Sequence, residues 1–414
     1  MSATLTNPAV DRTTNANFHH LVMDVAWFGL ALAASSRFAQ FYAIRLGATP
    51  IELGWLAALP SLVLMFATMI APWWRGRYDS SVNAVWLPGA TFRLIFLLPA
   101  FAPMLPEGFR VPWLILSASL PAVAQGIASV LFIVAMRESL LPEQLTRNFA
   151  RRAIWMNITV TIGVVGFGFM LEELPFPFNY QVMYVMAFAF SMVSQWHITK
   201  LRPIVPAQKP KRQPYDLMKR LRDPKFQSVA LVTMATYVGF MAIVAVIPLH
   251  LEANLGATEG FMAIYGVFEL MTAAFAASRT EWLVRRLGNR KVAALGMVGT
   301  ALAALIFGIA PNMWFTLPAA ALSGAAWTFA SIAVLGFFAD RTEAEDVGAA
   351  GIFHQILFAA MFIGPMLGNG LVSLGIPIAG VVVVGFGIRL IAAFITDRGL
   401  SLFGQKRIEP IKNS

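Results

Sequence analysis

The chain has 414 residues and a net charge of +10; 58% of the residues are hydrophobic and only 13% are charged. Soluble domains are about 45–50% apolar and about 25% charged, so this composition excludes a soluble globular protein and indicates an integral membrane protein. The absence of cysteine excludes disulfides, thiolate metal sites and thiol catalysis.

The N-terminal segment Met1–Asn17 is polar, and the first apolar stretch begins near Phe18. No small-residue cleavage site follows this stretch, so we predict a retained helix and not a signal peptide. A spanning helix needs about 20 mostly apolar residues. By this criterion the chain contains twelve candidate spans: Phe18–Ile44, Pro50–Trp73, Val82–Met104, Val111–Met136, Ala153–Met170, Tyr180–His197, Phe226–His250, Thr258–Ala277, Val292–Ile309, Trp314–Phe338, Ala349–Leu371 and Ile376–Ile395.

The spans fall into two sets of six, and this arrangement predicts an all-α membrane protein with two pseudo-symmetric six-helix bundles. The expected organisation is a cytoplasmic tail (1–17), an N-terminal bundle (18–198), a basic cytoplasmic linker (199–225), a C-terminal bundle (226–396) and a cytoplasmic tail (397–414).

A short internal repeat supports the doubling. Phe41-Tyr42-Ala43-Ile44-Arg45-Leu46-Gly47-Ala48-Thr49 is echoed half a chain later by His250-Leu251-Glu252-Ala253-Asn254-Leu255-Gly256-Ala257-Thr258, and Trp73 and Trp282 follow the two copies at the same spacing. Each Leu-Gly-Ala-Thr sequence, called an LGAT turn below, lies between two apolar stretches. The duplicated unit is therefore a bundle of membrane helices, an arrangement typical of transport between two halves.

Lysine and arginine gather in alternate loops, which accounts for the net charge without a nucleic-acid partner. With the N-terminus inside, the inward segments carry nearly all the basic residues, as the positive-inside rule requires. We therefore predict a multi-pass protein of the cytoplasmic (inner) membrane with both termini in the cytoplasm. The proline-containing basic linker is interpreted either as a tether on the anionic inner leaflet or as a site of specific lipid regulation.

Two basic loops carry a family resemblance. The second basic loop, Arg285-Arg286-Leu287-Gly288-Asn289-Arg290-Lys291, is similar to the Asp-Arg-x-Gly-Arg-Arg inner-loop pattern of the major facilitator superfamily, with Arg285 at the Asp position. The first basic loop, Arg75-Gly76-Arg77-Tyr78-Asp79, departs further from that pattern. Together with the doubled six-helix chain, these motifs resemble a secondary transporter of this superfamily over the whole chain, similar to drug exporters but with eroded signatures.

Other signatures match in part. Gln125-Gly126 resembles the Arg-x-x-Gln-Gly motif of the fourth helix, but Ala122 stands at the arginine position that the family associates with proton coupling. Gly364-Pro365-Met366-Leu367-Gly368 is similar to the Gly-Pro-x-x-Gly motif of the fifth helix, although it lies in the eleventh span and is better explained by close packing. The resemblance implies the superfamily fold, alternating access, and a gate at Arg285, Arg286, Gly288 and Arg290.

Charged residues within spans are expensive, so they face a cavity or a partner by default. Glu269, near the middle of the eighth span, is predicted to be a proton carrier or a partner of a cationic substrate, or else to belong to a structural ion pair. Asp24 lies nearer the inner end of the first span, where proton coupling and a helix-start role are both open.

Three arginines also lie within predicted spans, where a charge is unfavourable. Arg93 and Arg389 occur in matching contexts, in helices that the resemblance places outside the cavity, and we interpret both as structural, paired within their half or snorkelling. Arg37 lies in the first span, which lines the cavity in the family. It is predicted to bind a carboxylate or phosphate of the substrate, or else to brace the outer gate.

The remaining cavity candidates follow from the resemblance. Trp27, Tyr237 and Trp327 fall in helices that face the cavity in the family, and together they predict an aromatic-lined, partly apolar pocket. Gln125 and Asn157 add hydrogen-bonding groups. His354-Gln355 is interpreted as a solvated helix end or part of a gate, and His19-His20 as a surface pair and not a metal site.

The sequence therefore predicts a secondary active transporter that exports a small organic molecule, coupled to a proton or another ion. Uptake of an organic anion or sugar is the first alternative, and a non-transporting membrane scaffold or assembly factor is the second. The chain contains no Gly-rich nucleotide loop, so no ATP, metal or other cofactor is expected, and no enzymatic activity. The expected partners are the substrate and the lipid bilayer, and we expect a monomer.

Overall fold

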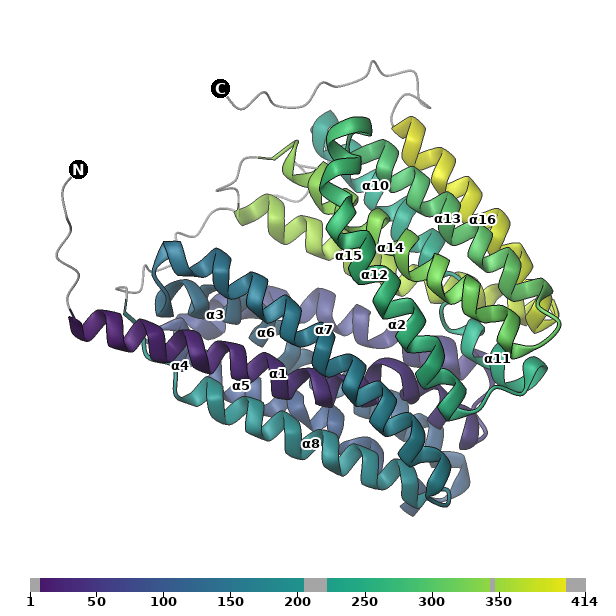
Figure 1. Ribbon diagram of the computed structural model, residues 1–414, viewed down its shortest axis with the longest axis horizontal. Coiled ribbons are helices and arrows are strands. Elements are labelled where there is room, and N and C mark those ends of the chain that lie inside the picture. Colours follow the sequence, from purple (N-terminus) through teal and green to yellow (C-terminus); the bar gives the residue numbers. More distant parts are fainter. Residues whose placement is uncertain (1–7, 205–221, 343–346, 400–414) are drawn as a thin grey trace. The chain divides into compact units, whose positions relative to one another are not determined.

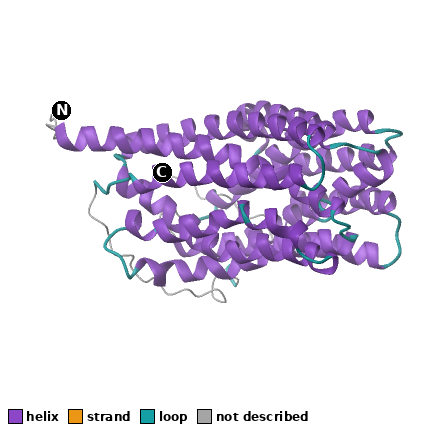
Figure 2. Ribbon diagram, turned by 90° about the horizontal axis from the view of Figure 1, so that it is seen from below, coloured by secondary structure: helices purple, strands orange, loops and turns teal. Residues whose placement is uncertain are grey.

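The computed structural model describes residues 8–204, 222–342 and 347–399; within these ranges, the side chains of residues 8–11, 36, 37, 142, 143, 146, 347 and 348 are not described. All regular elements in these ranges are helices, as Figure 2 shows, which confirms the predicted all-α class. Residues 205–221 of the predicted basic linker, 1–7 of the N-terminal tail and 400–414 of the C-terminal tail lie outside the described residues. Residues 8–17, predicted to be part of the N-terminal tail, belong to helix α1 instead.

Eleven helical stretches in the described part of the chain are long and apolar enough to cross a membrane. The remaining predicted span, Tyr180–His197, coincides with α8 (Phe178–Thr199), whose polar residues lower its mean hydropathy. Asn179, Ser191, Ser194 and Gln195 of this helix are nevertheless buried. The buried face of α8 is thus partly polar.

The chain divides into two compact units. Unit 1 comprises residues 1–42 and 63–211, and unit 2 comprises residues 43–62 and 212–414. The tip of the first helical hairpin, from Ala43 to Leu62, therefore belongs by its contacts to unit 2, although it lies in the first half of the sequence.

Unit 1 is built from most of α1 and from the helices up to the end of α8 (Figure 1). Its long helix α6 packs against α4, α5 and η3, and α8 packs against α5, α7, η2 and η3. The bounds are α1 (Pro8–Arg45), α3 (Ala71–Arg75), α4 (Ser81–Ala84), α5 (Trp86–Phe92), η2 (Arg93–Phe96), η3 (Leu98–Met104), α6 (Glu107–Ser139) and α7 (Pro142–Glu173).

Unit 2 contains most of α2 and all later helices. In it α13 packs against α14 and α16, α12 packs against α14, and α10 packs against α15 and α16 (Figure 1). The bounds are α2 (Pro50–Ala67), which η1 (Thr68–Ile70) continues in unit 1, then α10 (Pro224–Met241), α11 (Val246–Leu255), α12 (Glu259–Leu287), α13 (Asn289–Ile309), η4 (Met313–Thr316), α14 (Leu317–Ala339), α15 (Val347–Ser373) and α16 (Ile378–Arg398).

The seventh predicted span is a broken helix. α10 ends at Met241 and α11 begins at Val246, although residues 224–255 form one candidate span. Helix α15 approaches this break closely: a Cβ on Gly368 would lie 2.1 Å from the carbonyl oxygen of Ala242, and one on Gly364 would lie 2.5 Å from Cβ of Met241. The predicted close packing around Gly364 and Gly368 is confirmed.

The two LGAT turns have the same local structure. Gly47 and Gly256 both have positive φ values, 88° and 65°, the left-handed conformation that glycine adopts without a Cβ clash. Thr258 caps α12 by accepting a hydrogen bond from the Phe261 amide (3.2 Å), and Thr49 accepts one from the Glu52 amide (3.3 Å). The repeat seen in the sequence is thus a repeated helix–turn–helix junction.

Candidate functional site

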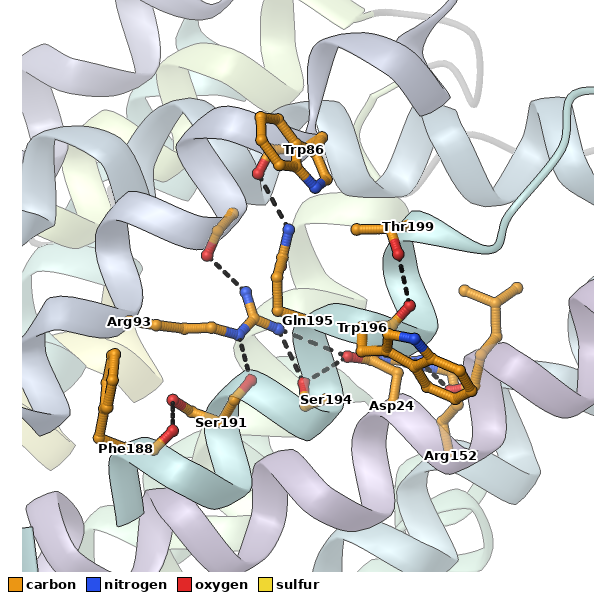
Figure 3. Close-up of polar contacts among 12 residues, drawn as sticks. Asp24, Trp86, Arg93, Arg152, Phe188, Ser191, Ser194, Gln195, Trp196 and Thr199 are labelled. Atoms are coloured by element: carbon orange, nitrogen blue, oxygen red, sulfur yellow. Dashed lines mark hydrogen bonds and ion pairs between the residues drawn. The ribbon is translucent and has the colours of Figure 1, made fainter. Parts of the chain in front are cut away.

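Asp24 is the centre of a buried charge cluster in unit 1 (Figure 3). Its Oδ2 atom lies 2.9 Å from Nη1 of Arg152 on α7, and its Oδ1 atom lies 3.6 Å from Nη2 of Arg93 at the start of η2. Ser194 of α8 donates its hydroxyl to Oδ1 at 2.7 Å. Asp24 is 4% exposed and Arg93 3%, so one carboxylate is shared by two guanidinium groups away from water.

Arg93 is held from three directions. Its Nε donates to the carbonyl of Ser191 (2.6 Å), its Nη1 to the carbonyl of Gly89 (2.5 Å) and its Nη2 to Ser194 (2.7 Å). The guanidinium also lies 4.9 Å from the ring centroid of Phe92. Hydrogen bonds of this number and geometry satisfy a charge that would otherwise be very costly to bury, and they explain the polar face of α8.

The cluster revises one explanation for Asp24. Because α1 begins at Pro8, well before Phe18, Asp24 is several turns inside the helix, and a helix-start role is wrong. Arg93 makes its ion pair within unit 1, as its structural interpretation requires. Sequence reasoning missed Arg152, which lies just outside the predicted span Ala153–Met170.

In unit 2 two predicted cavity aromatics meet. The rings of Tyr237 on α10 and Trp327 on α14 lie edge to face with centroids 5.0 Å apart. Trp327 also stacks on Phe240 at 3.8 Å, and the Arg389 guanidinium lies 4.7 Å from the Phe240 ring. These four residues form a column, called the aromatic column below, of which sequence reasoning missed Phe240.

Arg389 closes one end of the column and caps a helix. It is fully buried, and it donates to the carbonyls of Phe240 (2.9 Å) and Thr300 (2.8 Å). Phe240 lies in the last turn of α10, where backbone carbonyls lack helical partners and the helix dipole is negative. Arg389 therefore takes a helix end as its partner at the break between α10 and α11, within unit 2 as predicted.

Glu269 packs against α14 about one helical turn from Trp327 of the aromatic column. It is half-buried on α12, and a Cβ added at Gly324 of α14 would lie 2.8 Å from its Cγ. Gly324 precedes Trp327 by about one helical turn. Thr272, one turn after Glu269, donates to the Ala321 carbonyl of α14 at 2.8 Å. The fold thus gathers Glu269, Tyr237 and Trp327, from three helices, in one part of unit 2.

The other predicted cavity residues are not gathered in this way. In unit 1, Trp27 and Gln125 are half-buried and Asn157 is exposed. Trp27 contacts Phe190 with ring centroids 5.9 Å apart. Arg37 lies in α1, but its side chain is outside the described residues. These four assignments remain predictions.

One arginine of each basic loop forms an ion pair with a glutamate outside the loop. In the first, Arg75 is buried and lies 3.3 Å from Glu138 at the end of α6. Glu138 also accepts hydrogen bonds from the amide and hydroxyl of Ser81, both at 2.7 Å. Sequence reasoning missed Glu138; the only signal was a single acidic residue at the end of a span, next to Arg137.

In the second basic loop, Arg285 pairs with Glu281 one turn earlier at 3.4 Å, and both side chains are exposed. Gly288 joins α12 to α13 with φ of 80°, a conformation that requires glycine. Asn289 donates to Asp340 at 2.8 Å. A gating role for Arg285, Arg286, Gly288 and Arg290 remains a prediction.

An ion pair links the two LGAT turns. Arg45, directly before the first turn, binds Glu259, directly after the second, in a bidentate pair with both distances at 3.0 Å. Glu259 is 5% exposed. Nearby, Asn369 of α15 donates to the Ile51 carbonyl of α2 at 3.0 Å. All four residues belong to unit 2.

His20 and His354 each lie within hydrogen-bond distance of another polar group. His20 is not confined to a surface pair with His19, because its Nδ1 lies 2.9 Å from Nδ1 of His197 on α8. His354 is exposed, and its Nδ1 lies 2.8 Å from the Ala350 carbonyl. Across the residues that the structure describes, no group of three or more His, Cys, Asp or Glu side chains could hold a metal ion.

A family model and one curated relative match the chain. The model of the Major Facilitator Superfamily matches residues 20–365. "Multidrug resistance protein 2" of Bacillus subtilis (strain 168) is 29% identical over 163 residues, and this match covers 37% of the chain and 36% of that protein. The chain thus matches about a third of that relative's length.

Solved structures are similar over almost the whole chain. A mutant of the nucleoside transporter NupG has a TM-score of 0.73 at 13% identity, with 92% of this chain and 98% of that chain covered. The xylose transporter XylE from E. coli, in a partially occluded inward open conformation, has a TM-score of 0.68 at 12% identity, with 97% and 99% covered. At such identities the likeness concerns the fold alone.

Proposed function

The chain belongs to the Major Facilitator Superfamily, a family of multi-pass membrane transporters and not of enzymes, and from this premise we propose that it is a proton-coupled exporter of small organic molecules in the cytoplasmic membrane. Both termini lie in the cytoplasm, and the two halves work by alternating access. No ATP or other cofactor takes part.

The observation that carries the proposal is the convergence of Glu269 with the aromatic column. Glu269 is a half-buried carboxylate in the interior of a spanning helix, a position at which an ionisable residue commonly marks a substrate or proton pathway. Glu269 stands about a turn of α14 away from Trp327, which contacts Tyr237. A carboxylate beside aromatic rings suits an amphipathic organic molecule with a positive charge, and the same carboxylate can carry a proton in the opposite direction.

Asp24 is the second proton-coupling candidate, and its surroundings differ. Two arginines and a serine already engage its carboxylate. Protonation of the Asp24 carboxylate would break its ion pairs with Arg93 and Arg152. We assign the principal coupling role to Glu269 because it packs against α14 about one helical turn from Trp327, one of the predicted cavity aromatics.

The LGAT turns support alternating access. Residues 43–62 belong to unit 2 by contact, and the Arg45–Glu259 and Asn369–Ile51 interactions hold them there. In our proposal the Arg45–Glu259 and Asn369–Ile51 interactions close the transporter on its outer side. Both interactions break when the transporter opens outward.

The test is proton movement in proteoliposomes as amphipathic cations, organic acids and sugars are added in turn. We expect cationic amphiphiles to evoke a proton flux opposite to their own movement, and Glu269→Gln to abolish it. Glu107→Gln is the control, because it removes a carboxylate that is 91% exposed and that lies next to none of the predicted gate or coupling residues. A proton flux in the same direction as an added organic acid or sugar would contradict export and support uptake of that compound. Silence with every compound would favour a non-transporting scaffold.

A further inference from the structure

Each basic loop presents an arginine stacked on an exposed tryptophan. The Arg77 guanidinium lies 3.6 Å from the ring centroid of Trp73, and the Arg286 guanidinium lies 4.1 Å from that of Trp282. Among the described residues, neither guanidinium makes a hydrogen bond or an ion pair. Both arginines therefore retain all their N–H donors for a ligand outside the chain.

Their neighbours are engaged differently. Arg75 pairs with Glu138 and Arg285 with Glu281, so each loop has one arginine bound to a carboxylate and one stacked on indole. In the part of the chain that the structure describes, neither Arg77 nor Arg286 has a carboxylate within ion-pair distance, so the positive charge of each is uncompensated.

The two tryptophans lie on the surface. Trp73 is 58% exposed and Trp282 is 48% exposed. The adjacent Trp74, in contrast, turns inward and donates its indole N–H to the Ala84 carbonyl at 2.9 Å. The exposure of Trp73 is therefore not a property of the whole segment.

Both pairs stand at the same distance from an LGAT turn. The number of residues from Thr49 to Trp73 equals that from Thr258 to Trp282, and at about 1.5 Å per helical residue it spans about 36 Å. The hydrocarbon core of a bilayer is about 30 Å thick, and about 40–45 Å with the headgroups. If the LGAT turns lie at one membrane surface, the Trp–Arg pairs lie at the headgroup level of the other, where tryptophan is favoured.

We propose that the Trp73–Arg77 and Trp282–Arg286 pairs are two repeat-related binding sites for the phosphate of an anionic phospholipid. The planar guanidinium binds two phosphate oxygens in a bidentate manner, and the indole beneath it fixes its orientation and packs against the glycerol region. The preference for an anionic lipid follows from the uncompensated charge. This inference does not depend on what the protein transports.

The experiment is native mass spectrometry of the purified protein with phosphatidylglycerol, and with phosphatidylcholine for comparison. We expect the wild type to retain two phosphatidylglycerol molecules preferentially. The double variant Arg77→Gln, Arg286→Gln should bind them more weakly by about fivefold per site, the effect expected of one arginine near an anionic surface. The double variant Arg77→Lys, Arg286→Lys should fall between, because it keeps the charge and loses the planar, bidentate geometry.

The matched control is Arg285→Gln, which removes the same charge from an exposed arginine of the same loop that is paired with Glu281. Retention equal to the wild type in this control supports the two sites, provided that all variants melt at similar temperatures in phosphatidylcholine. If Arg285→Gln lowers phosphatidylglycerol binding as much as the double variant does per site, net charge alone explains the effect and the proposal is overturned. Unchanged retention in the double glutamine variant, or equal retention of both lipids by the wild type, would also overturn it.

Discussion

Arg93 in unit 1 and Arg389 in unit 2 are both buried arginines followed by Leu-Ile, and yet their partners are of different kinds. Arg93 shares the carboxylate of Asp24 with Arg152. Arg389 has no carboxylate within ion-pair distance among the described residues; it donates to two backbone carbonyls and lies against the ring of Phe240.

The difference shows two ways of stabilising a charge inside a membrane protein. In unit 1 a full negative charge compensates the arginines, so removal of Asp24 leaves two buried cations without a counter-charge. In unit 2 the compensation is the dipole at the end of α10, which is part of the backbone and remains when Arg389 is replaced. The same residue type is thus linked to a charge network in one unit and to a broken helix in the other.

The largest expected effect is that of Asp24→Asn. This change leaves Arg93 and Arg152 unpaired, and we expect the free energy of unfolding to fall by about 3–5 kcal/mol. Denaturant or thermal unfolding in detergent measures it. Asp79→Asn is the control, because it removes an exposed carboxylate from the same unit.

Combining Asp24→Asn with Arg93→Met should recover part of the loss, since one of the two orphaned cations is then removed. If Asp24→Asn is as stable as the wild type but loses proton coupling, Asp24 is a proton carrier and the comparison with Arg389 fails.

A smaller effect is expected of Arg389→Met. The change removes two hydrogen bonds but also a desolvated charge, and methionine fills a similar length, so the loss should not exceed about 2 kcal/mol. The same unfolding measurement applies. A loss as large as that of Asp24→Asn would mean that the α10 end and the Phe240 ring stabilise the cation as strongly as a carboxylate does.

The smallest effect on stability is expected at the LGAT turns, where the arginine of the ion pair is near water. Arg45 is 41% exposed, so Arg45→Gln should lower the free energy of unfolding by less than about 1 kcal/mol, and high salt should remove the difference. The check is to measure the unfolding midpoint of Arg45→Gln and of the wild type at increasing salt concentration. The same series on Asp24→Asn then shows whether the buried ion pairs are less sensitive to salt than this exposed one.

The same variant tests the gate. The chain has no cysteine, so a single cysteine at Ala48 can report access from outside with an impermeant thiol reagent. Arg45→Gln should accelerate labelling, and the charge exchange of Arg45→Glu with Glu259→Arg should restore the slow rate. Equal labelling in all three proteins would exclude a gating role for the pair.

Part of the candidate site was accessible from the sequence. Glu269 and Asp24 were identified because carboxylates within apolar spans are rare, and Tyr237 and Trp327 because of the helices that carry them. The sequence did not indicate that the last two touch, or that Phe240 lies between Trp327 and Arg389, since phenylalanine is common throughout the chain. Glu138 and Glu259 were missed because each lies at a helix end, where an acidic residue is unremarkable.

The sequence by itself determined the features that depend on local composition: the class, the positions of the spans, the repeated LGAT turns with their glycines and threonine caps, and the family. The tertiary structure alone decided which polar groups meet. Asp24 and Ser194 are 170 positions apart in sequence, and Arg45 and Glu259 are 214 apart. The physical reason is that apolar length and turn chemistry act within a few residues, whereas an ion pair depends on how packed helices are rotated and shifted against one another, which an almost uniformly apolar sequence does not encode in any local pattern.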